Sequence, residues 1–284
     1  MNASVKNNQD LRPLAGIVIP TTDNSFFSNL ADYAARCLYE EGCTPLILSS
    51  ANDAETEKSH LRSLSLLGAK GILCVSGLRS LPEDLLPADY PLVWVDRHPE
   101  SCRSVPLVAN DDQSAMALAT DYLLEKGCRN ILLLPGYQAE NRTSPRVLGY
   151  EEALRKHGIE PDPAYILHRA GRKSSEAETE ELIRDVMGKG IPADAVITSS
   201  DRAALGVITA LHHVGLYVPE DIKLISFDNS PYSAMASPAI TALDRNPRLL
   251  AQTACRTLLS LIKGEPVESR TIIPVSLCKR DSTR

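Results

Sequence analysis

Charged side chains follow two apolar runs in this sequence, at the points where β-strands would end. Asp96 and Arg97 follow the run 92–95, and Asp228 follows the run 223–227. In open α/β sheets, ligands bind beyond the carboxyl ends of the strands, where an aspartate can accept hydrogen bonds from two neighbouring hydroxyl groups. Turns and helix caps use the same residue types. The sequence leaves both interpretations open.

Two arginines mark the beginning of a predicted helix. Arg142 and Arg146 lie four residues apart, with Pro145 between them, directly after the loop 135–141. Residues four apart share one face of a helix, and a helix N-terminus beside arginine suits an anion or a hydroxyl group. The alternative is an exposed basic face, which the position after a loop makes less favoured.

Two adjacent aromatic residues open the helix that follows the first predicted strand. Phe26 and Phe27 lie just beyond the apolar run 14–19 and a short polar loop. At the carboxyl edge of a sheet either ring could stack on a small ligand, and either could belong to the hydrophobic core. We favour Phe26 for the ligand and leave Phe27 evenly divided between ligand and core.

Patterns that would indicate catalysis or a cofactor are missing from the sequence. There is no glycine-rich phosphate loop, no G-x-S-x-G or H-E-x-x-H motif, and no nucleophile with an evident base. The six histidines and seven cysteines lack metal-ligand spacing. We therefore predict a binding protein that is not an enzyme, with no metal and no cofactor.

Strand-like and helix-like segments alternate along the chain in two similar halves. Apolar runs rich in Val, Ile and Leu are typical of parallel strands buried on both faces. Right-handed crossovers would make each half an open parallel sheet with helices on both sides. The predicted strands are 15–20, 44–50, 71–75, 92–96, 107–109, 130–135, 165–168, 195–198, 223–227, 240–243 and 270–275, before a polar tail. The predicted helices are 25–41, 53–67, 111–125, 143–157, 174–187, 200–214 and 247–263.

Composition places the chain among soluble two-lobed proteins. It has 284 residues and a formal net charge of −6, which disfavours a broad nucleic-acid surface. The first eleven residues are polar and lack the apolar run of a signal peptide, and no stretch is long enough for a membrane span. An odd number of scattered cysteines favours free thiols in a reducing compartment. We predict a cytoplasmic protein without membrane contact.

A series of short motifs resembles the effector-binding core of the LacI/GalR family of bacterial transcription regulators. The resemblance extends over about residues 13–281, and the motifs are specific in their order and spacing rather than singly. They are Gly16-Ile17-Val18-Ile19-Pro20 with Asn24, Val95-Asp96-Arg97, Asp111-Asp112, Gly127-Cys128-Arg129-Asn130-Ile131, Arg146-Val147-Leu148-Gly149-Tyr150, Asp201-Arg202-Ala203-Ala204-Leu205-Gly206 and Val218-Pro219-Glu220-Asp221-Ile222.

The resemblance implies a periplasmic-binding-protein-like α/β fold, with two doubly wound parallel-sheet lobes joined by three crossovers and a ligand in the cleft between them. The N-terminal lobe would comprise residues 13–127 and 243–265. The C-terminal lobe would comprise 128–242 and 266–284. Residues 1–12 would be a hinge remnant or a linker.

The resemblance also implies a ligand-binding set. Arg146 would be the main anchor, with a phenylalanine stacking and two aspartates accepting hydrogen bonds. Four cations in this set suggest an anionic ligand, a sugar acid or a sugar phosphate, unless some of them face solvent or acidic neighbours. In the family that the sequence resembles, the ligands are usually sugars and sometimes nucleobases or phosphorylated metabolites. The predicted set is Asn24, Phe26, Phe27, Asp96, Arg142, Arg146, Lys173, Ser200, Asp228 and Arg245.

The function implied by the resemblance is sensing a small-molecule effector as a homodimer and controlling transcription, most often as a repressor. Operator DNA would bind only through an N-terminal helix-turn-helix that this chain lacks. Ser200 and Lys173 also depart from the family's usual residues, asparagine and an aromatic respectively. The alternative function is that of a solute-binding component of a sugar transporter.

Overall fold

The chain folds into two compact units. The computed structural model describes residues 12–136, 144–168 and 176–284, apart from residues 79, 81, 83, 88 and 100–103. Unit 1 is Met1–Ala109 with Pro247–Ile273, and unit 2 is Asn110–Asn246 with Pro274–Arg284. The chain therefore passes three times from one unit to the other. No helix in the described ranges is long and apolar enough to cross a membrane.

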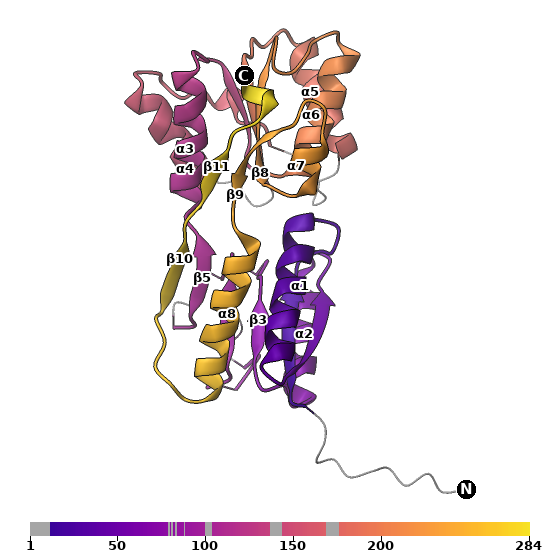
Figure 1. Ribbon diagram of the computed structural model, residues 1–284, viewed down its shortest axis with the longest axis vertical. Helices are drawn as coiled ribbons and strands as arrows, with labels where there is room; N and C mark the ends of the chain where they lie inside the picture. Colours follow the sequence, from indigo (N-terminus) through magenta and orange to yellow (C-terminus); the bar gives the residue numbers. More distant parts are fainter. Residues whose placement is uncertain are drawn as a thin grey trace, which may run out of the picture. The chain divides into compact units, whose positions relative to one another are not determined.

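Unit 1 is built on a six-stranded sheet with the order β10-β5-β4-β3-β1-β2. Figure 1 labels β10, β5 and β3 of this sheet and the helices α1, α2 and α8 of the same unit. Each pair from β2 to β5 is parallel. This is the doubly wound arrangement that the alternating strand and helix pattern predicts. Its elements are β1 (Leu14–Ile19), α1 (Ser25–Glu40), β2 (Thr44–Ser49), α2 (Ala54–Leu66), β3 (Ile72–Cys74), β4 (Leu92–Val95), β5 (Leu107–Asn110), α8 (Pro247–Ile262) and β10 (Arg270–Ile273).

Helices cover both faces of this sheet, and alternate residues of each strand serve the two faces. Ile17 and Ile19 of β1 belong to the cluster formed with α1 and α8. Val18 belongs to the opposite cluster, with Leu61 and Leu64 of α2. Because successive side chains of a strand point to opposite faces, a strand covered on both sides must be apolar throughout. This explains the continuous runs seen in the sequence.

Unit 2 has a five-stranded sheet with the order β11-β9-β8-β7-β6. Its strands are parallel except β11, which runs antiparallel to β9. Helices α3 and α4 cover one face, and α5 and α6 cover the other. The elements are α3 (Asp112–Glu125), β6 (Ile131–Leu134), α4 (Pro145–Lys156), α5 (Glu176–Gly188), β7 (Ala195–Thr198), α6 (Asp201–His213), β8 (Lys223–Asp228), α7 (Pro231–Met235), β9 (Thr241–Asp244) and β11 (Ser276–Cys278), with 3-10 turns at Pro163–Tyr165 and Asp281–Thr283.

The division into units differs from the one expected from the sequence. The first lobe was predicted to extend over residues 13–127 and 243–265, but unit 1 ends at Ala109 and resumes at Pro247–Ile273. Helix α3 belongs to unit 2 because its buried face packs with α4 on the second sheet. Gly149 permits the close approach of these two helices, since a Cβ there would lie 2.0 Å from the Gln113 carbonyl oxygen.

Two predicted segments take other forms. Residues 165–168 were predicted as a strand, but Pro163–Tyr165 forms a 3-10 turn capped by Asp162, and Ile166 alone bridges to Leu133. The polar tail contains strand β11, and Ser282 and Thr283 beyond it are buried against the sheet. The burial of this tail could not be predicted from its polar composition, because its side chains are buried through hydrogen bonds inside the unit. Ser282, for example, bonds to the backbone of Leu224 and Thr241.

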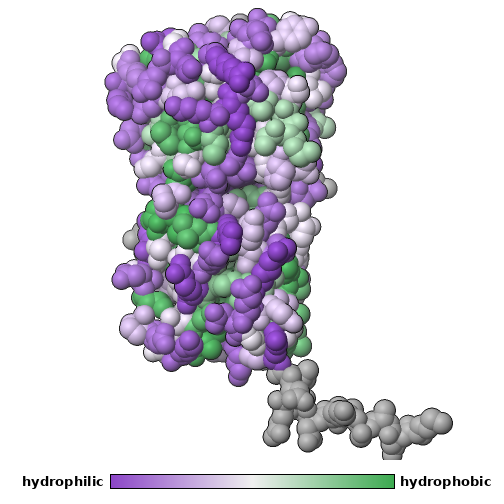
Figure 2. Space-filling view, viewed as in Figure 1, coloured by the Kyte–Doolittle hydropathy of each residue, from purple (hydrophilic) through white to green (hydrophobic). Residues whose placement is uncertain are grey.

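The surface visible in Figure 2 is mainly hydrophilic, with small hydrophobic areas between polar side chains. Among the described residues, the most exposed large hydrophobic side chains are Leu66 (88%) at the end of α2 and Met235 (83%) at the end of α7. Single exposed apolar side chains are common on soluble proteins. These two stand out by the extent of their exposure.

Candidate functional site

Left-handed backbone conformations occur at the carboxyl ends of two strands, one in each unit. Asp96 after β4 has φ +67°, and Asp228 and Asn229 at the end of β8 have φ +104° and +56°. Residues other than glycine adopt such angles at a cost of about 1–3 kcal/mol, and they cluster at functional sites. The two aspartates predicted from the sequence therefore lie at strained positions, each on its own sheet edge.

Arg146 is held at this edge of unit 2 by several contacts. Pro145 occupies the first turn of α4, as expected for a helix N-terminus. The Arg146 Nε donates to Oδ2 of Asp112 over 2.8 Å. Its guanidinium carbon lies 4.0 Å from the centroid of the Phe227 ring. These contacts hold the guanidinium plane in one orientation. A fixed orientation favours paired hydrogen bonds from the arginine to one ligand group.

Arg245 reaches the same group of residues from the chain segment after β9. Its side chain is buried, and Nε donates to Oδ1 of Asn110 over 3.2 Å. One terminal nitrogen lies 3.5 Å from Oδ1 of Asp228, and the other lies 3.9 Å from Oδ1 of Asp112. Its guanidinium carbon is 5.5 Å from the Phe227 centroid. The sheet edge thus gathers residues that are distant in sequence.

We call Arg146, Arg245, Asp112 and Asp228 the arginine–aspartate quartet. Two guanidinium groups and two carboxylates give it a formal charge of zero. The N–H groups can donate to ligand oxygens, and the carboxylates can accept from ligand hydroxyls. Phe227 supplies an apolar floor beneath the arginines. This chemistry suits recognition of a hydroxylated molecule.

Unit 1 brings a second set of predicted residues together at the end of β4. The Arg97 Nε lies 3.7 Å from Oδ2 of Asp96, and the Arg97 guanidinium lies 5.2 Å from the Phe27 ring centroid. Phe27 is partly exposed and packs against the core from its rim. Asn24 caps α1 by accepting a hydrogen bond from the Phe26 backbone N–H over 2.8 Å.

Of the two phenylalanines, Phe26 does not take the position that was preferred for it. Phe26 was favoured for the ligand, but it is only 2% exposed and belongs to the buried cluster formed with β1 and α8. Phe27 is the ring left accessible at this edge. The sequence could not distinguish them because a single step along a helix turns a side chain by about 100°, and the helical phase depends on where α1 begins.

Comparisons with known proteins agree with this architecture. A family model described as a periplasmic binding protein-like domain matches residues 120–283, more than half of the chain. The chain belongs to the periplasmic binding protein-like domain family. Its two mainly parallel sheets with covering helices are therefore those of a known type of fold.

Within this family, the relatives are LacI-type regulators of transcription. The ribose operon repressor of Halalkalibacterium halodurans is 27% identical over 273 residues, covering 95% of this chain and 80% of the repressor. A LacI-type transcription regulator of Bifidobacterium animalis is 26% identical with a TM-score of 0.84, covering 95% and 99% of the two chains. A periplasmic binding protein/LacI transcriptional regulator of Alkaliphilus metalliredigens, solved with D-xylulofuranose, is 26% identical with a TM-score of 0.82, covering 95% and 99%. These relatives do not favour the transporter alternative.

Ser200, another predicted site residue, is placed by α6. It is the N-cap, and its hydroxyl accepts from the Ala203 backbone N–H over 3.3 Å. The neighbouring Asp201 is buried, and burial raises its pKa. Its carboxylate accepts hydrogen bonds from the Ser226 hydroxyl and the Ser230 backbone. Asp201 therefore supports the turn that carries Asp228. Of the other predicted site residues, Arg142 and Lys173 lie outside the described residues.

Glu57 is a buried acidic residue of unit 1 that the sequence analysis missed. It is 1% exposed, and its carboxylate accepts from the Ser76 hydroxyl over 2.5 Å and the Gly77 backbone over 2.8 Å. Burial raises the pKa of this carboxyl above its ordinary value. Glu57 lies in the first turn of α2, where an acidic residue usually favours the helix dipole. Because an acidic residue in a first helical turn is common, nothing in the sequence indicated that Glu57 also binds Ser76 and Gly77 in the segment after β3.

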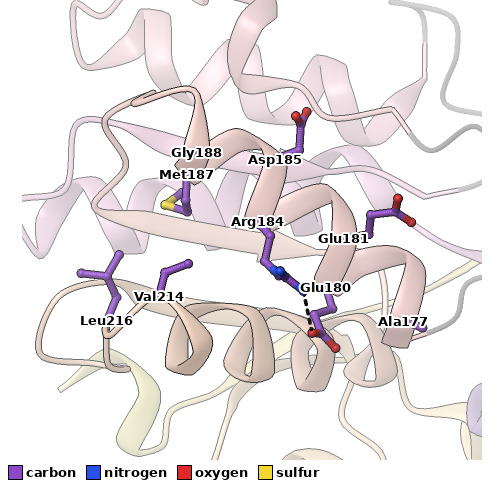
Figure 3. A pocket seen from close by; sticks show the side chains of 9 residues that line it. All are labelled: Ala177, Glu180, Glu181, Arg184, Asp185, Met187, Gly188, Val214 and Leu216. Carbon is purple, nitrogen blue, oxygen red and sulfur yellow. Dashed lines mark ion pairs between the residues drawn. The ribbon is translucent and has the colours of Figure 1, made fainter.

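A surface pocket of unit 2 lies elsewhere. It is formed by α5 and the turn after α6, with Arg184 paired to Glu180 over 3.8 Å and Val214 and Leu216 facing them (Figure 3). Helix α6 starts at the carboxyl end of β7 and runs antiparallel to that strand. Its last turn therefore lies toward the amino ends of the strands, away from the carboxyl edge that carries the quartet. The pocket is therefore separate from the arginine–aspartate quartet.

Proposed function

We propose that the arginine–aspartate quartet binds the effector of this LacI-type core, and that the effector is a sugar or a sugar-derived metabolite. The single observation that carries the proposal is the packing of Arg146 and Arg245 on Phe227, each with a carboxylate partner. A sugar ring presents hydroxyl groups that donate and accept. The donors and acceptors of the quartet match these hydroxyl groups, and the fully buried Phe227 ring supports the guanidinium groups from beneath. Asp96 and Phe27 of unit 1 are proposed as further ligand residues.

A neutral sugar is favoured over an anion by the charge of the quartet. The carboxylates already balance both guanidinium groups, so an anionic ligand would have to compete with Asp112 and Asp228. The anionic alternative depends on Arg142 and Lys173. A sugar acid or sugar phosphate would become the preferred class if those two cations joined the site.

The proposed consequence of binding is allosteric control of DNA binding. Ligand binding shifts a conformational equilibrium only as far as it binds one state more tightly than the other. Operator DNA would be held by a helix-turn-helix domain outside this sequence, and the protein would act in the cytoplasm as a repressor. The role is that of a regulator and not of an enzyme.

The core is further proposed to act as a homodimer. Tyr232 and Met235 of α7 expose apolar surface on unit 2, and Leu66 and Leu67 do so on unit 1. Exposed apolar groups of this kind often mark protein–protein contacts. Sedimentation velocity over a range of concentrations tests the state, and Met235→Lys should shift it toward monomer. A wild-type chain that sediments as a monomer at every concentration would refute the dimer.

A thermal unfolding panel tests the ligand class. The chain is heated with neutral pentoses and hexoses, sugar acids, sugar phosphates and nucleosides in turn. A ligand present at about one hundred times its dissociation constant should add about 2.7 kcal/mol of stability. A rise in Tm with neutral sugars supports the proposal, and a rise with anions alone supports the cationic alternative. If nucleosides alone raise the Tm, the sugar proposal is wrong.

A further inference from the structure

Helices α1 and α8 of unit 1 pack through small side chains. Ala31 and Ala34 of α1 are buried in the same cluster as Ala251 and Ala254 of α8. Small residues at a helix contact let the two backbones approach closely. The side chain of Cys255, on the next position of α8, thereby comes within 3.5 Å of the Ala34 carbonyl oxygen, measured from its Sγ.

A second thiol lies beside Cys255. Cys37 is one helical turn beyond Ala34 on α1, and it packs against the same buried cluster that contains Cys255. The two sites differ in access, because Cys255 is fully buried and Cys37 is partly exposed. An accessible thiol directly beside a buried one is the arrangement of a reactive cysteine with a resolving partner.

The surroundings favour the thiolate at Cys37 over that at Cys255. The Cys255 thiol hydrogen-bonds to Cys37 and lowers the Cys37 pKa to about 7, with a smaller contribution from Arg256. Burial and the charges of Glu40 and Glu41 oppose this shift. The pKa of Cys255 is raised by the same hydrogen bond and by burial, with the neighbouring Cys43 acting in the same direction.

We propose that Cys37 and Cys255 form a reversible disulfide between α1 and α8, with hydrogen peroxide as the oxidant. The Cys37 thiolate attacks one peroxide oxygen and the O–O bond breaks, giving a sulfenic acid and, after protonation, water. The Cys255 sulfur then attacks the Cys37 sulfur and releases the hydroxyl group with the thiol proton as a second molecule of water. Two thiols lose two electrons and two protons, and the peroxide is reduced. A disulfide needs Cα atoms about 5.5–6 Å apart, and the close packing of α1 against α8 through alanines favours such a separation.

The disulfide would fix the last turn of α1. That turn also holds Arg12, which donates to the Tyr39 carbonyl oxygen over 3.0 Å and lies with its guanidinium carbon 4.3 Å from the Tyr39 ring centroid. Arg12 is the first residue that the structure describes. Oxidation is therefore expected to tighten this part of unit 1 and to raise the Tm of the chain.

Peptide mapping of the full chain tests the proposal. The protein is treated with a small excess of hydrogen peroxide, quenched in acid, alkylated and digested under non-reducing conditions. We expect a linked peptide pair containing Cys37 and Cys255, lost after dithiothreitol. In Cys255→Ser, Cys37 should instead be trapped by dimedone as a sulfenic acid. In Cys37→Ser, neither product should form.

A matched control is Cys278, which is also partly exposed but lies in unit 2. Iodoacetamide at pH 7 should alkylate Cys37 about tenfold faster than Cys278, because the thiolate is the reacting form. Cys278→Ser should leave the linked peptide unchanged. Wild-type Cys37 that oxidises no faster than Cys278, or that stays a sulfenic acid without linking to Cys255, would overturn the proposal.

Discussion

Arg146 of α4 donates a hydrogen bond from Nε to Oδ2 of Asp112 over 2.8 Å. Asp112 is the first residue of α3, so the bond joins the N-termini of two helices that pack together on the sheet of unit 2. It orients the guanidinium at the carboxyl edge, where the quartet is formed. The interaction thus connects the packing of α3 with α4 to the geometry of the proposed ligand site.

Replacement of Arg146 by alanine should weaken ligand binding strongly. Loss of a hydrogen-bonded guanidinium that contacts the ligand costs about 2–5 kcal/mol, which corresponds to at least about a thirtyfold higher Kd for the ligand found in the thermal panel. The control is Arg155→Ala on the same helix, whose exposed ion pair with Glu151 should contribute little. Calorimetric titration measures both variants. An unchanged Kd for Arg146→Ala contradicts the site assignment.

The two phenylalanines at the start of α1 should respond in opposite ways. Phe26→Ala removes a buried ring and should destabilise the fold by about 3–5 kcal/mol. Phe27→Ala removes a partly exposed ring that lies against Arg97, so it should reduce ligand affinity with a smaller loss of stability. Urea unfolding and calorimetric titration separate the two effects. Equal losses of stability would show that Phe27 is also a core residue.

Gly149 should resist substitution. A Cβ there would meet the Gln113 carbonyl oxygen at 2.0 Å, which would force α3 and α4 apart. Overpacking of this kind costs about 1–3 kcal/mol, and the Arg146–Asp112 bond should be disturbed as well. Gly188→Ala is the control, since nothing lies within 4 Å of its added Cβ. Urea unfolding should show a loss of stability for Gly149→Ala and little change for Gly188→Ala.

Glu57 should make the stability of the chain depend on pH. Burial raises its pKa above the ordinary 4.5, so between 4.5 and the raised value the folded state holds a proton that the unfolded state has lost. The free energy of unfolding therefore falls as pH rises through this window and becomes level above it. Asp201, whose pKa is also raised by burial, acts in the same direction.

Glu57→Gln should reduce this fall because the amide does not titrate. The exposed Glu55 of the same helix provides the control, and Glu55→Gln should keep the wild-type slope. Urea unfolding of the three proteins at intervals from pH 4.5 to 7 makes the comparison. A wild-type stability that rises over this range in parallel with Glu57→Gln would contradict the assigned direction.

The order of elements could be predicted from the sequence because the signals are local. Apolar runs mark strands that are buried on both faces, and capping residues such as Asp53 and Asp111 mark helix starts close to where they occur. The same locality placed Asp96 and Asp228 at strand ends. Local patterns failed at 165–168, where Pro163 and Asp162 begin a 3-10 turn that leaves a single bridging residue.

The partners of these residues were decided by tertiary structure. Asp112 is 34 residues from Arg146, and Asn110 is 135 residues from Arg245, so no spacing in the sequence joins them. The assignment of α3 to unit 2 and the burial of Phe26 in the core have the same origin. Local sequence determines which elements form, but a side chain's neighbours depend on how helical phase and sheet packing bring distant segments together.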